Sequence, residues 1–394
     1  MAEEARFMDI VEAFLSARGD IERALGAGPR FEELSAAWLP IRTDLSPRDA
    51  LGRMGSVAGI DGGSHLVEVN LGQSLFAVSS ASVAFRAGDR PEPRRVFQVG
   101  VIDFFKAEDR VRIYREALEA KMAAVLAIGR EVDYVLLDGS LEANLAAEPV
   151  FRGARPGRYA GLSEEERELI VSAFLRVVRN LPLASALTVI TATPATQATL
   201  EEAARDIVGD DEEGEGRKPL LAVSAMERLE QGVSLLALVA AAERAGVRVV
   251  AVAKRSSASS HFRSSKPDLA IVQRYTRGPG RTPCRVREVA VGRHILRAAR
   301  AIVGPGVGDT VRLTTLYARL ARSVAPVKLE ILGELEEDEV DELIGNLAGI
   351  SVLGYPYPLR RAHELAKITR SDMEAGLRSI GFVPEFTGRE ALGE

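Results

Sequence analysis

The sequence lacks several features that would assign it to particular protein classes. It contains a single cysteine, Cys284, so it has no internal disulfide and no cysteine-based zinc site. No apolar run reaches the roughly 18 residues that a membrane span needs. The N-terminus is acidic and periodic, unlike a signal peptide. These absences predict a protein of the reducing cytoplasm that has no membrane partner.

Several familiar catalytic motifs are also missing. The glycine-rich stretch GPGVGDT at 304–310 lacks the Gly-Lys-Ser/Thr that a phosphate-binding loop needs. The chain has neither a Gly-x-Ser-x-Gly elbow nor a His-Glu-x-x-His motif. The sequence therefore gives little support to an ATPase or a serine hydrolase.

Neither sign of charge dominates overall, but positive charge is concentrated in one segment. The net charge is −5, which gives no global attraction to nucleic acid. Residues 251–300 nevertheless hold 12 Lys and Arg against two acids, a local net charge of +10. Such a segment in an acidic chain favours a face that binds a polyanion. The alternative is a solvated surface balanced by the acidic runs at 209–216 and 333–342.

The hydrophobic pattern predicts an α/β fold in one large domain with elaborations. Strands are expected at 56–60, 74–85, 95–105, 133–137, 186–191, 247–253, 268–272, 285–292 and 327–332. Helices are expected at 4–26, 111–129, 163–180, 227–245, 336–348, 358–368 and 371–380. Ser163 with Glu166, and Ser371 with Glu374, have the spacing of capping boxes. The acidic, Gly-bearing segment 205–218 is expected to be an exposed loop.

Two of the apolar strands run directly into Asp-Gly, in IDGGS at Asp61 and in VLLDGSL at Asp138. A carboxylate at the C-terminal end of a buried strand points into the crevice where open α/β sheets bind ligands. The glycine that follows allows a sharp turn and the close approach of a substrate. Each Asp-Gly is also a common way to begin an ordinary turn. From these residues alone both interpretations stay open.

The helix expected at 111–129 adds further acids to this edge. Glu116 and Glu119 lie about one turn apart, and the helix leads straight into the strand before Asp138. Clustered carboxylates repel one another unless divalent cations offset their charge. Oxygen ligands suit Mg²⁺ or Mn²⁺, and paired ions support in-line phosphodiester hydrolysis. The alternative for either glutamate is an exposed helix charge.

Three later residues are further candidates. Lys254 closes the strand VRVVAVA, where a cation can hold a phosphate or stabilise charge in a transition state. His363 follows a Pro-bearing turn, and its imidazole can bind a metal or shuttle a proton near neutral pH. Tyr355 can stack on single-stranded bases. The alternatives are a solvated lysine, a structural histidine and an aromatic ring that only packs.

Taken in order, these motifs resemble the NurA nuclease family. The resemblance rests on IDGGS, REALE (115–119), VLLDGSL, VVAVAKRSS (249–257) and GYPYPLRRAHELA (354–366), and it spans residue 57 to about residue 375. It implies a ribonuclease H-like mixed sheet flanked by helices, with helical elaborations. It also suggests an N-terminal helical segment, 1–50, for dimer or partner contacts, followed by a nuclease domain, 51–394.

The resemblance further implies a metal-dependent deoxyribonuclease that acts in double-strand break resection and homologous recombination. Such enzymes degrade single-stranded DNA from 5′ to 3′ and also show endonuclease activity on DNA, with Mn²⁺ or Mg²⁺, here expected as two ions. They form homodimers that dock on the hexameric ATPase HerA, and their substrates include single- and double-stranded DNA.

The family motifs carry roles to individual residues of this sequence. The implied metal ligands are Asp61, Asp138 and one of Glu116 or Glu119. His363 would be a further ligand or a proton shuttle, Lys254 would lie at the same strand edge, and Tyr355 would position the site or contact nucleic acid. Two other functions stay open: action on RNA or a nucleotide, and a noncatalytic nucleic-acid-binding or assembly subunit that retains the fold.

Overall fold

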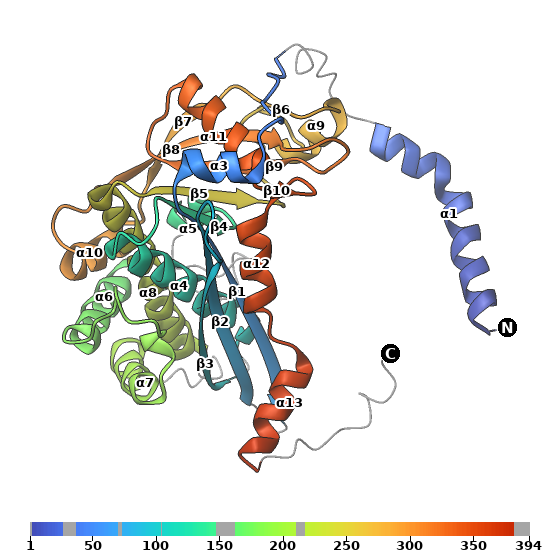
Figure 1. The fold of residues 1–394 in the computed structure, drawn as a ribbon. Helices are drawn as coiled ribbons and strands as arrows, with labels where there is room; N and C mark the ends of the chain where they lie inside the picture. The colour runs from blue at the N-terminus through green and yellow to red at the C-terminus, as the bar shows by residue number, and fades with distance from the viewer. Residues whose placement is uncertain are drawn as a thin grey trace.

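A mixed β-sheet with helices on both faces forms the centre of the molecule (Figure 1). The computed structural model describes residues 2–26, 37–69, 73–103, 105–146, 162–209 and 217–381. The strands of the main sheet are β1 (Val57–Val69), β2 (Gln73–Phe85), β3 (Glu92–Asp103), β4 (Tyr134–Asp138), β5 (Arg248–Ala253), β6 (Gly280–Arg281), β7 (Arg285–Ala290), β8 (Thr310–Arg319) and β9 (Val327–Leu332). A separate ribbon pairs β10 (Ser351–Val352) with β11 (Tyr355–Pro356).

The helices lie around this sheet and before it. They are α1 (Ala2–Gly26), α3 (Pro47–Met54), α4 (Ala107–Ile128), α5 (Leu141–Ala146), α6 (Glu164–Val178), α7 (Pro194–Val208), α8 (Arg217–Ala245), α9 (Asp268–Tyr275), α10 (Arg293–Ile302), α11 (Glu337–Gly349), α12 (Tyr357–Ala366) and α13 (Arg370–Ser379), with the short 3-10 helix η1 (Ile190–Ala192). Among the described helices, none is long and apolar enough to cross a bilayer.

The strand order is β3-β2-β1-β4-β5-β9-β8-β6, with β7 also paired to β8. Strands β1, β4 and β5 are parallel neighbours, whereas β2 and β3 extend the sheet on one side through antiparallel pairs. On the other side, β9 is antiparallel to β5. The carboxyl ends of three parallel strands therefore meet at one edge, which is where open sheets position their ligands.

Alternate residues of the central strands point to opposite faces, and both faces are buried. Ile60 and Leu137 pack into a core formed with α4, α6, α7, α8 and α10. Val57 and Leu136 face the other way, into a core formed with α3, α11 and α12. The prediction of a mixed α/β sheet flanked by helices is confirmed.

Two predicted strands are wrong. Residues 268–272 lie in α9, because a short apolar run does not distinguish a buried helix from a buried strand. Residues 186–191 form no strand, and only their end enters η1. There the N–H groups of Ile190 and Thr191 donate to the buried Glu230 carboxylate at 2.8 and 2.7 Å. A side chain thus satisfies backbone groups that a neighbouring strand would otherwise bond.

Other boundaries also differ from expectation. The sequence did not indicate β8, and α8 begins ten residues earlier than the predicted 227. Part of the expected loop 205–218 is helical, since α7 continues to Val208; residues 210–216 lie outside the described residues. The capping box of α6 is confirmed. Helix α13 is capped by Thr369 and Asp372 and not by the predicted pair, because it begins at Arg370.

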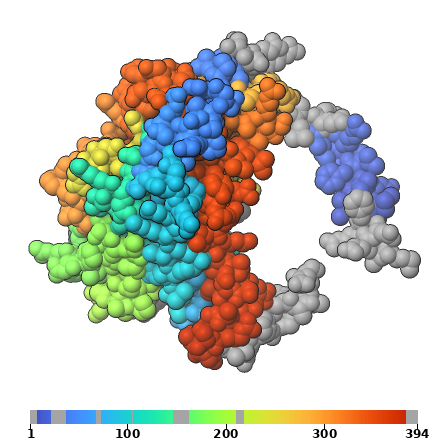
Figure 2. All heavy atoms as spheres, in the orientation of Figure 1, coloured from blue at the N-terminus to red at the C-terminus, as the bar shows by residue number. Residues whose placement is uncertain are grey.

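Helix α1 confirms the helix expected at 4–26 and stands apart from the rest of the described chain (Figure 1). Figure 2 shows the same separation in space-filling form, with open space between α1 and the body. Met8, Phe14 and Leu15 expose more than three fifths of their surface. By contrast, α3 packs on α11, and Leu39 pairs with Arg281 of the sheet.

Candidate active site

The motif IDGGS lies inside β1 and not at its end. The expected turn after Asp61 is wrong, because β1 continues to Val69 in antiparallel register with β2. The glycines instead allow two helices to approach the strand. A Cβ atom on Gly62 would overlap the Glu119 carboxylate of α4, and one on Gly63 would overlap the last carbonyl of α12, that of Ala366. The glycines do permit a close approach, but the groups that approach are two helices and not a substrate.

The two aspartates lie side by side in the register of the sheet. The parallel pairing of β1 with β4 reaches Ile60 and Leu137, so Asp61 and Asp138 come one residue later on adjacent strands. Both therefore point to the face that α12 covers, as the alternation of the strands requires. Gly139, after Asp138, has φ of +129°, so this second glycine does form the expected turn.

Asp61 is held between its own strand and α12. Only 6% of the residue is exposed. Its Oδ1 accepts the Gly62 N–H at 2.7 Å, and its Oδ2 lies 2.7 Å from His363 Nδ1. Burial raises the pKa of Asp61, the charge of Asp138 raises it further, and the contacts with His363 and Gly62 oppose the rise. A nearby cation would therefore favour the ionised form of Asp61, whereas burial favours the protonated form.

Glu119 is the glutamate that packs against the strand carrying Asp61. Its carboxylate packs against Gly62, and its side chain is only 12% exposed. Arg115 Nε lies 3.4 Å from Glu119 Oε1. Burial raises the pKa of Glu119 well above its usual value; Arg115 opposes this, and the charges of Asp61, Glu116 and Asp138 add to it.

Glu116 points elsewhere on the same helix. Its Oε2 accepts a hydrogen bond from Gln231 of α8, and its Oε1 lies 3.8 Å from Arg112 Nη1. The structure therefore brings Glu119, and not Glu116, against the strand that carries Asp61. Sequence spacing did not distinguish them, because residues one turn apart lie on partly overlapping faces of a helix.

Lys254 and Tyr355 complete the cluster around Asp138. Lys254 Nζ lies 3.0 Å from Asp138 Oδ2 and 4.0 Å from the centre of the Tyr355 ring. Leu353 and Gly354, with φ of +53° and +74°, form the tight turn that presents Tyr355 on β11. The Tyr355 hydroxyl is buried beside Asp138, without a well-aligned hydrogen bond. Burial, and then the charge of Asp138, raise the pKa of this hydroxyl, so it stays protonated.

Sequence reasoning missed a buried support behind Asp138. Glu330 of β9 is fully buried, and its carboxylate accepts the Ser140 hydroxyl at 2.8 Å and the Glu142 N–H at 2.9 Å. Lys328 Nζ lies 2.6 Å from Glu330 Oε1 and balances its charge. These bonds fix the turn after Asp138. The signal was present as a Lys and a Glu in the apolar strand VKLEIL, where charges are rare unless paired.

The basic segment 251–300 does not form one continuous face. Arg281 is buried and ion-paired with Glu337 and Asp341. Arg293 and Arg297 lie on α10, which belongs to the face opposite Asp61, and both pair with acids there. Lys254, in contrast, lies in the site itself. The prediction that this segment forms one polyanion-binding face is therefore too broad, because neighbours along the chain lie on different faces of the fold.

Comparison with known proteins gives a consistent relationship. Residues 55–368 match the sequence profile of the NurA domain. A relative from Saccharolobus solfataricus, named DNA double-strand break repair nuclease NurA, is 24% identical over 326 residues, which cover 82% of this chain and 79% of the relative.

Solved structures share the fold. The crystal structure of the NurA nuclease from Sulfolobus solfataricus superposes with a TM-score of 0.62 at 20% identity, covering 95% of this chain and 96% of that one. A crystal structure of NurA bound to dAMP and manganese gives a TM-score of 0.56 at 15% identity, with 99% and 98% coverage. Because the profile spans most of the sequence and the fold agrees with it, the chain belongs to the NurA family.

Proposed function

We propose that this chain is a metal-dependent deoxyribonuclease. One observation carries the proposal: carboxylates from three separate elements, Asp61, Glu119 and Asp138, lie near enough, where the parallel strands pair beside His363, for their charges to raise the pKa values of Asp61 and Glu119. Such a gathering of acids is costly in a folded protein unless a cation offsets it. The names of the relative and of the manganese-bound structure are consistent with this chemistry.

The donor set fits a hard divalent cation. The carboxylate oxygens of this site suit Mn²⁺ or Mg²⁺. Burial is the main cause of the raised pKa values of Asp61 and Glu119, and the charge of Asp138 adds to both, so a bound cation would favour their ionised forms. The buried Tyr355 hydroxyl, beside Asp138, is a further polar atom at the same site. We propose Asp61, Glu119 and Asp138 as ligands, without Glu116, and two ions when the site is loaded.

Bound ions would supply Lewis acidity for in-line displacement at a phosphodiester. The protein's own groups have separate roles in the proposal. Asp61 holds the His363 imidazole through Nδ1, and 60% of the histidine side chain is exposed, so it can exchange a proton with solvent. Lys254, 48% exposed above the Tyr355 ring, can turn from Asp138 to a phosphate oxygen.

The finer assignments are also proposals. They comprise 5′-to-3′ exonuclease and endonuclease activity, a ribonuclease H-like core, action in end resection, homodimer formation and docking on a HerA-type ATPase. The strand order β3-β2-β1-β4-β5 supports the proposed core. The separate helix α1, with its exposed apolar side chains, supports a partner-contact role for the segment 1–50 ahead of the nuclease domain 51–394.

Metal-stripped protein tests the central proposal. Adding Mn²⁺ with end-labelled single-stranded DNA should give cleavage, and labels at either end should report polarity. Asp61→Asn should reduce the rate at least 100-fold with an unchanged circular dichroism spectrum. Asp89→Asn, on the exposed turn between β2 and β3, is the matched control. If the folded wild-type protein binds DNA without cutting it, the alternative function as a noncatalytic nucleic-acid-binding subunit is favoured. If it cleaves RNA and not DNA, the alternative function as an enzyme acting on RNA is favoured.

Lys254 needs a separate test, because a binding role and a chemical role predict different kinetics. Lys254→Met keeps the aliphatic length that packs over Tyr355 but removes the charge. We expect the single-turnover rate to fall more than tenfold while DNA affinity changes less than threefold. Weaker binding with an unchanged single-turnover rate would contradict this role.

A further inference from the structure

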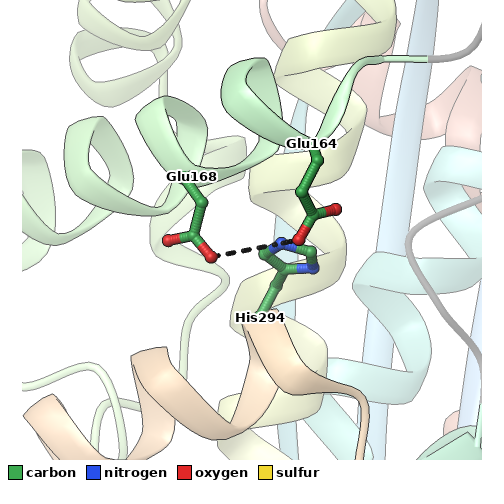
Figure 3. A group of neighbouring side chains, drawn as sticks. All are labelled: Glu164, Glu168 and His294. Atoms are coloured by element: carbon green, nitrogen blue, oxygen red, sulfur yellow. Dashed lines mark ion pairs between the residues drawn. The ribbon is translucent and has the colours of Figure 1, made fainter.

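A second cluster of metal-type ligands lies between α6 and α10, on the sheet face opposite Asp61 (Figure 3). Glu164 and Glu168 are one turn apart on α6, and His294 projects toward them from α10. Within the described parts of the chain, these three side chains form the one group of His, Cys or acidic residues whose ligand atoms all lie within 4.8 Å of one another. The cluster takes no part in the proposed nuclease site.

The histidine is the unusual member of this cluster. His294 is 95% buried, since only 5% of the residue is exposed, and its Nε2 has no hydrogen-bond partner. That nitrogen lies 3.5 Å from Glu164 Oε1 and 3.7 Å from Glu168 Oε1. A buried imidazole nitrogen without a hydrogen bond costs free energy of folding. A ligand bound between this nitrogen and the two carboxylates would remove that cost.

The spacing matches ligands of a single ion. Zinc bonds to imidazole nitrogen and carboxylate oxygen of about 2.0–2.2 Å place neighbouring ligand atoms about 3.3–3.6 Å apart around a tetrahedron. The two measured separations lie close to this range and exceed an ordinary N–H···O hydrogen bond. A mixed nitrogen and oxygen set favours zinc-type ions over Mg²⁺ or Ca²⁺, which prefer oxygen alone.

The acids already have partners, and these partners can leave. Arg293 Nη2 lies 2.8 Å from Glu164 Oε1 and 2.6 Å from Glu168 Oε1, while Arg297 pairs with the other oxygen of Glu168. These surface ion pairs offset the charge of the two glutamates, but they leave the His294 Nε2 atom without a hydrogen-bond partner. Because the Arg293 side chain is 68% exposed, its guanidinium can move into water at little cost.

We propose that Glu164, Glu168 and His294 bind a zinc-type divalent ion that displaces Arg293 and joins α6 to α10. Water would complete the fourth position. Since α6 and α10 also pack together through buried residues such as Ile170 and Ile295, the ion would lock a contact that already exists. Binding would therefore stabilise the folded chain without touching the edge that carries Asp61.

Zinc titration of the full chain tests this site. Asp61→Asn with Asp138→Asn removes carboxylates of the proposed nuclease site, so ions bound there are not counted. In that background, calorimetry should show one Zn²⁺ per chain, and Co²⁺ should give the visible absorption of a tetrahedral complex. Added Zn²⁺ should also raise the melting temperature. A background protein that binds no zinc would overturn the proposal.

Single substitutions in the same background identify the ligands. Glu164→Gln and His294→Gln should each weaken zinc binding at least tenfold. Because Glu164 is exposed, its variant should fold even if the histidine variant does not. Arg293→Gln should tighten binding severalfold by removing the competing cation. Glu165→Gln, an exposed neighbour on α6, is the matched control. Equal affinity in Glu164→Gln and Glu165→Gln would refute the site.

Discussion

Asp61 experiences opposing influences within a few ångströms. Burial and the charge of Asp138 favour the neutral acid, whereas the contact with His363 favours the carboxylate. Glu119 is under the same burial penalty and has Arg115 as its nearest cation. Groups with strongly shifted pKa values in one place are typical of functional sites, because such arrangements cost stability. At the scale of single residues, the site therefore invites a test by charge removal.

Glu119→Gln and Glu116→Gln should behave differently, although they are one turn apart. Removing the charge of Glu119 should raise the free energy of unfolding of the metal-free protein by about 1 kcal/mol, because a buried, repelled charge disappears. The same change should abolish stabilisation by Mn²⁺. Glu116→Gln keeps the polar contact to Gln231 and should retain that stabilisation. Thermal melts with and without Mn²⁺ decide this, and equal effects would show that Glu116 shares the role.

The raised pKa values of Asp61 and Glu119 predict how the stability of the metal-free protein and its affinity for Mn²⁺ change with pH. Both carboxyls keep their proton to higher pH in the folded chain than at their ordinary values of 3.8 and 4.5. Their contribution to the stability of the metal-free protein is therefore fully present below those values and declines as pH rises toward the folded pKa values. Mn²⁺ needs the ionised forms, so its affinity should rise over the same range.

Calorimetric titrations of Mn²⁺ across pH should show this rise. Melts of the metal-free protein should show the decline, and the double variant Asp61→Asn, Glu119→Gln should show a flatter profile. A Mn²⁺ affinity that falls with pH through this range would exclude these carboxyls as ligands.

At the scale of secondary-structure elements, β1 provides the surface on which α12 packs. Gly59 faces the backbone of Pro358 and Leu359 so closely that no Cβ atom fits. The Ser79 hydroxyl, on β2, donates to the Ala366 carbonyl at the other end of the helix. His363 therefore reaches Asp61 because a whole helix lies flat on a strand built from small residues.

Gly59→Ala should shift α12 and destabilise the fold by about 1–3 kcal/mol, since the added methyl meets backbone and not a movable side chain. It should also lower Mn²⁺-dependent cleavage by moving His363. Gly52→Ala is the control, because that glycine lies in α3 with nothing within 4 Å of a new Cβ and should gain about 0.5–1 kcal/mol. Denaturant melts compare the two, and equal stability of both variants would show that α12 does not dock as described.

Sequence patterns predicted these elements unevenly, for physical reasons. The long periodic helix α4 and the apolar strands β2 and β5 follow the expected segments because their own pattern fixes their type. Asp268 shows what pattern cannot reveal. Its buried carboxylate accepts the N–H groups of His261 and Phe262 and the Tyr317 hydroxyl, and these bonds from outside the helix accompany a helix where a strand was expected.

The candidate site was predictable in part for the same reason. Asp61 and Asp138 were visible as acids in apolar strands, and their convergence follows from parallel pairing. The difference between Glu116 and Glu119 depends on where α8 and β1 lie around α4, which no spacing along the chain encodes. The same holds for Glu330, which supports the Asp138 turn from β9.

At the scale of the whole molecule, α1 is the element with the least support from the body. Figure 2 shows it separated from the rest, and Phe14 and Leu15 each expose 64% of their surface. A helix that exposes such residues in water gains stability by packing on a partner. This observation supports the proposed dimer or ATPase contact through the N-terminal segment.

Phe14→Asp should weaken self-association at least tenfold while leaving the body folded, because no α1 residue whose burial is described belongs to its core. Sedimentation velocity at matched concentrations measures this, and circular dichroism checks the fold. Ser16→Asp adds the same charge at a position that carries no apolar group and should leave association unchanged. If both variants sediment like the wild type, α1 is not the dimer contact, and binding to the ATPase is then the remaining test of its role.

The contact between Asp61 and His363 spans 302 positions of the chain. At a ribosomal speed of about 5–20 residues per second, the imidazole follows its aspartate by about 15–60 s. During that interval the nascent polypeptide carries the first acid without its histidine, and α12 has yet to emerge. The partly synthesised chain thus has an incomplete site, and the complete cluster can form only after α12 has been translated.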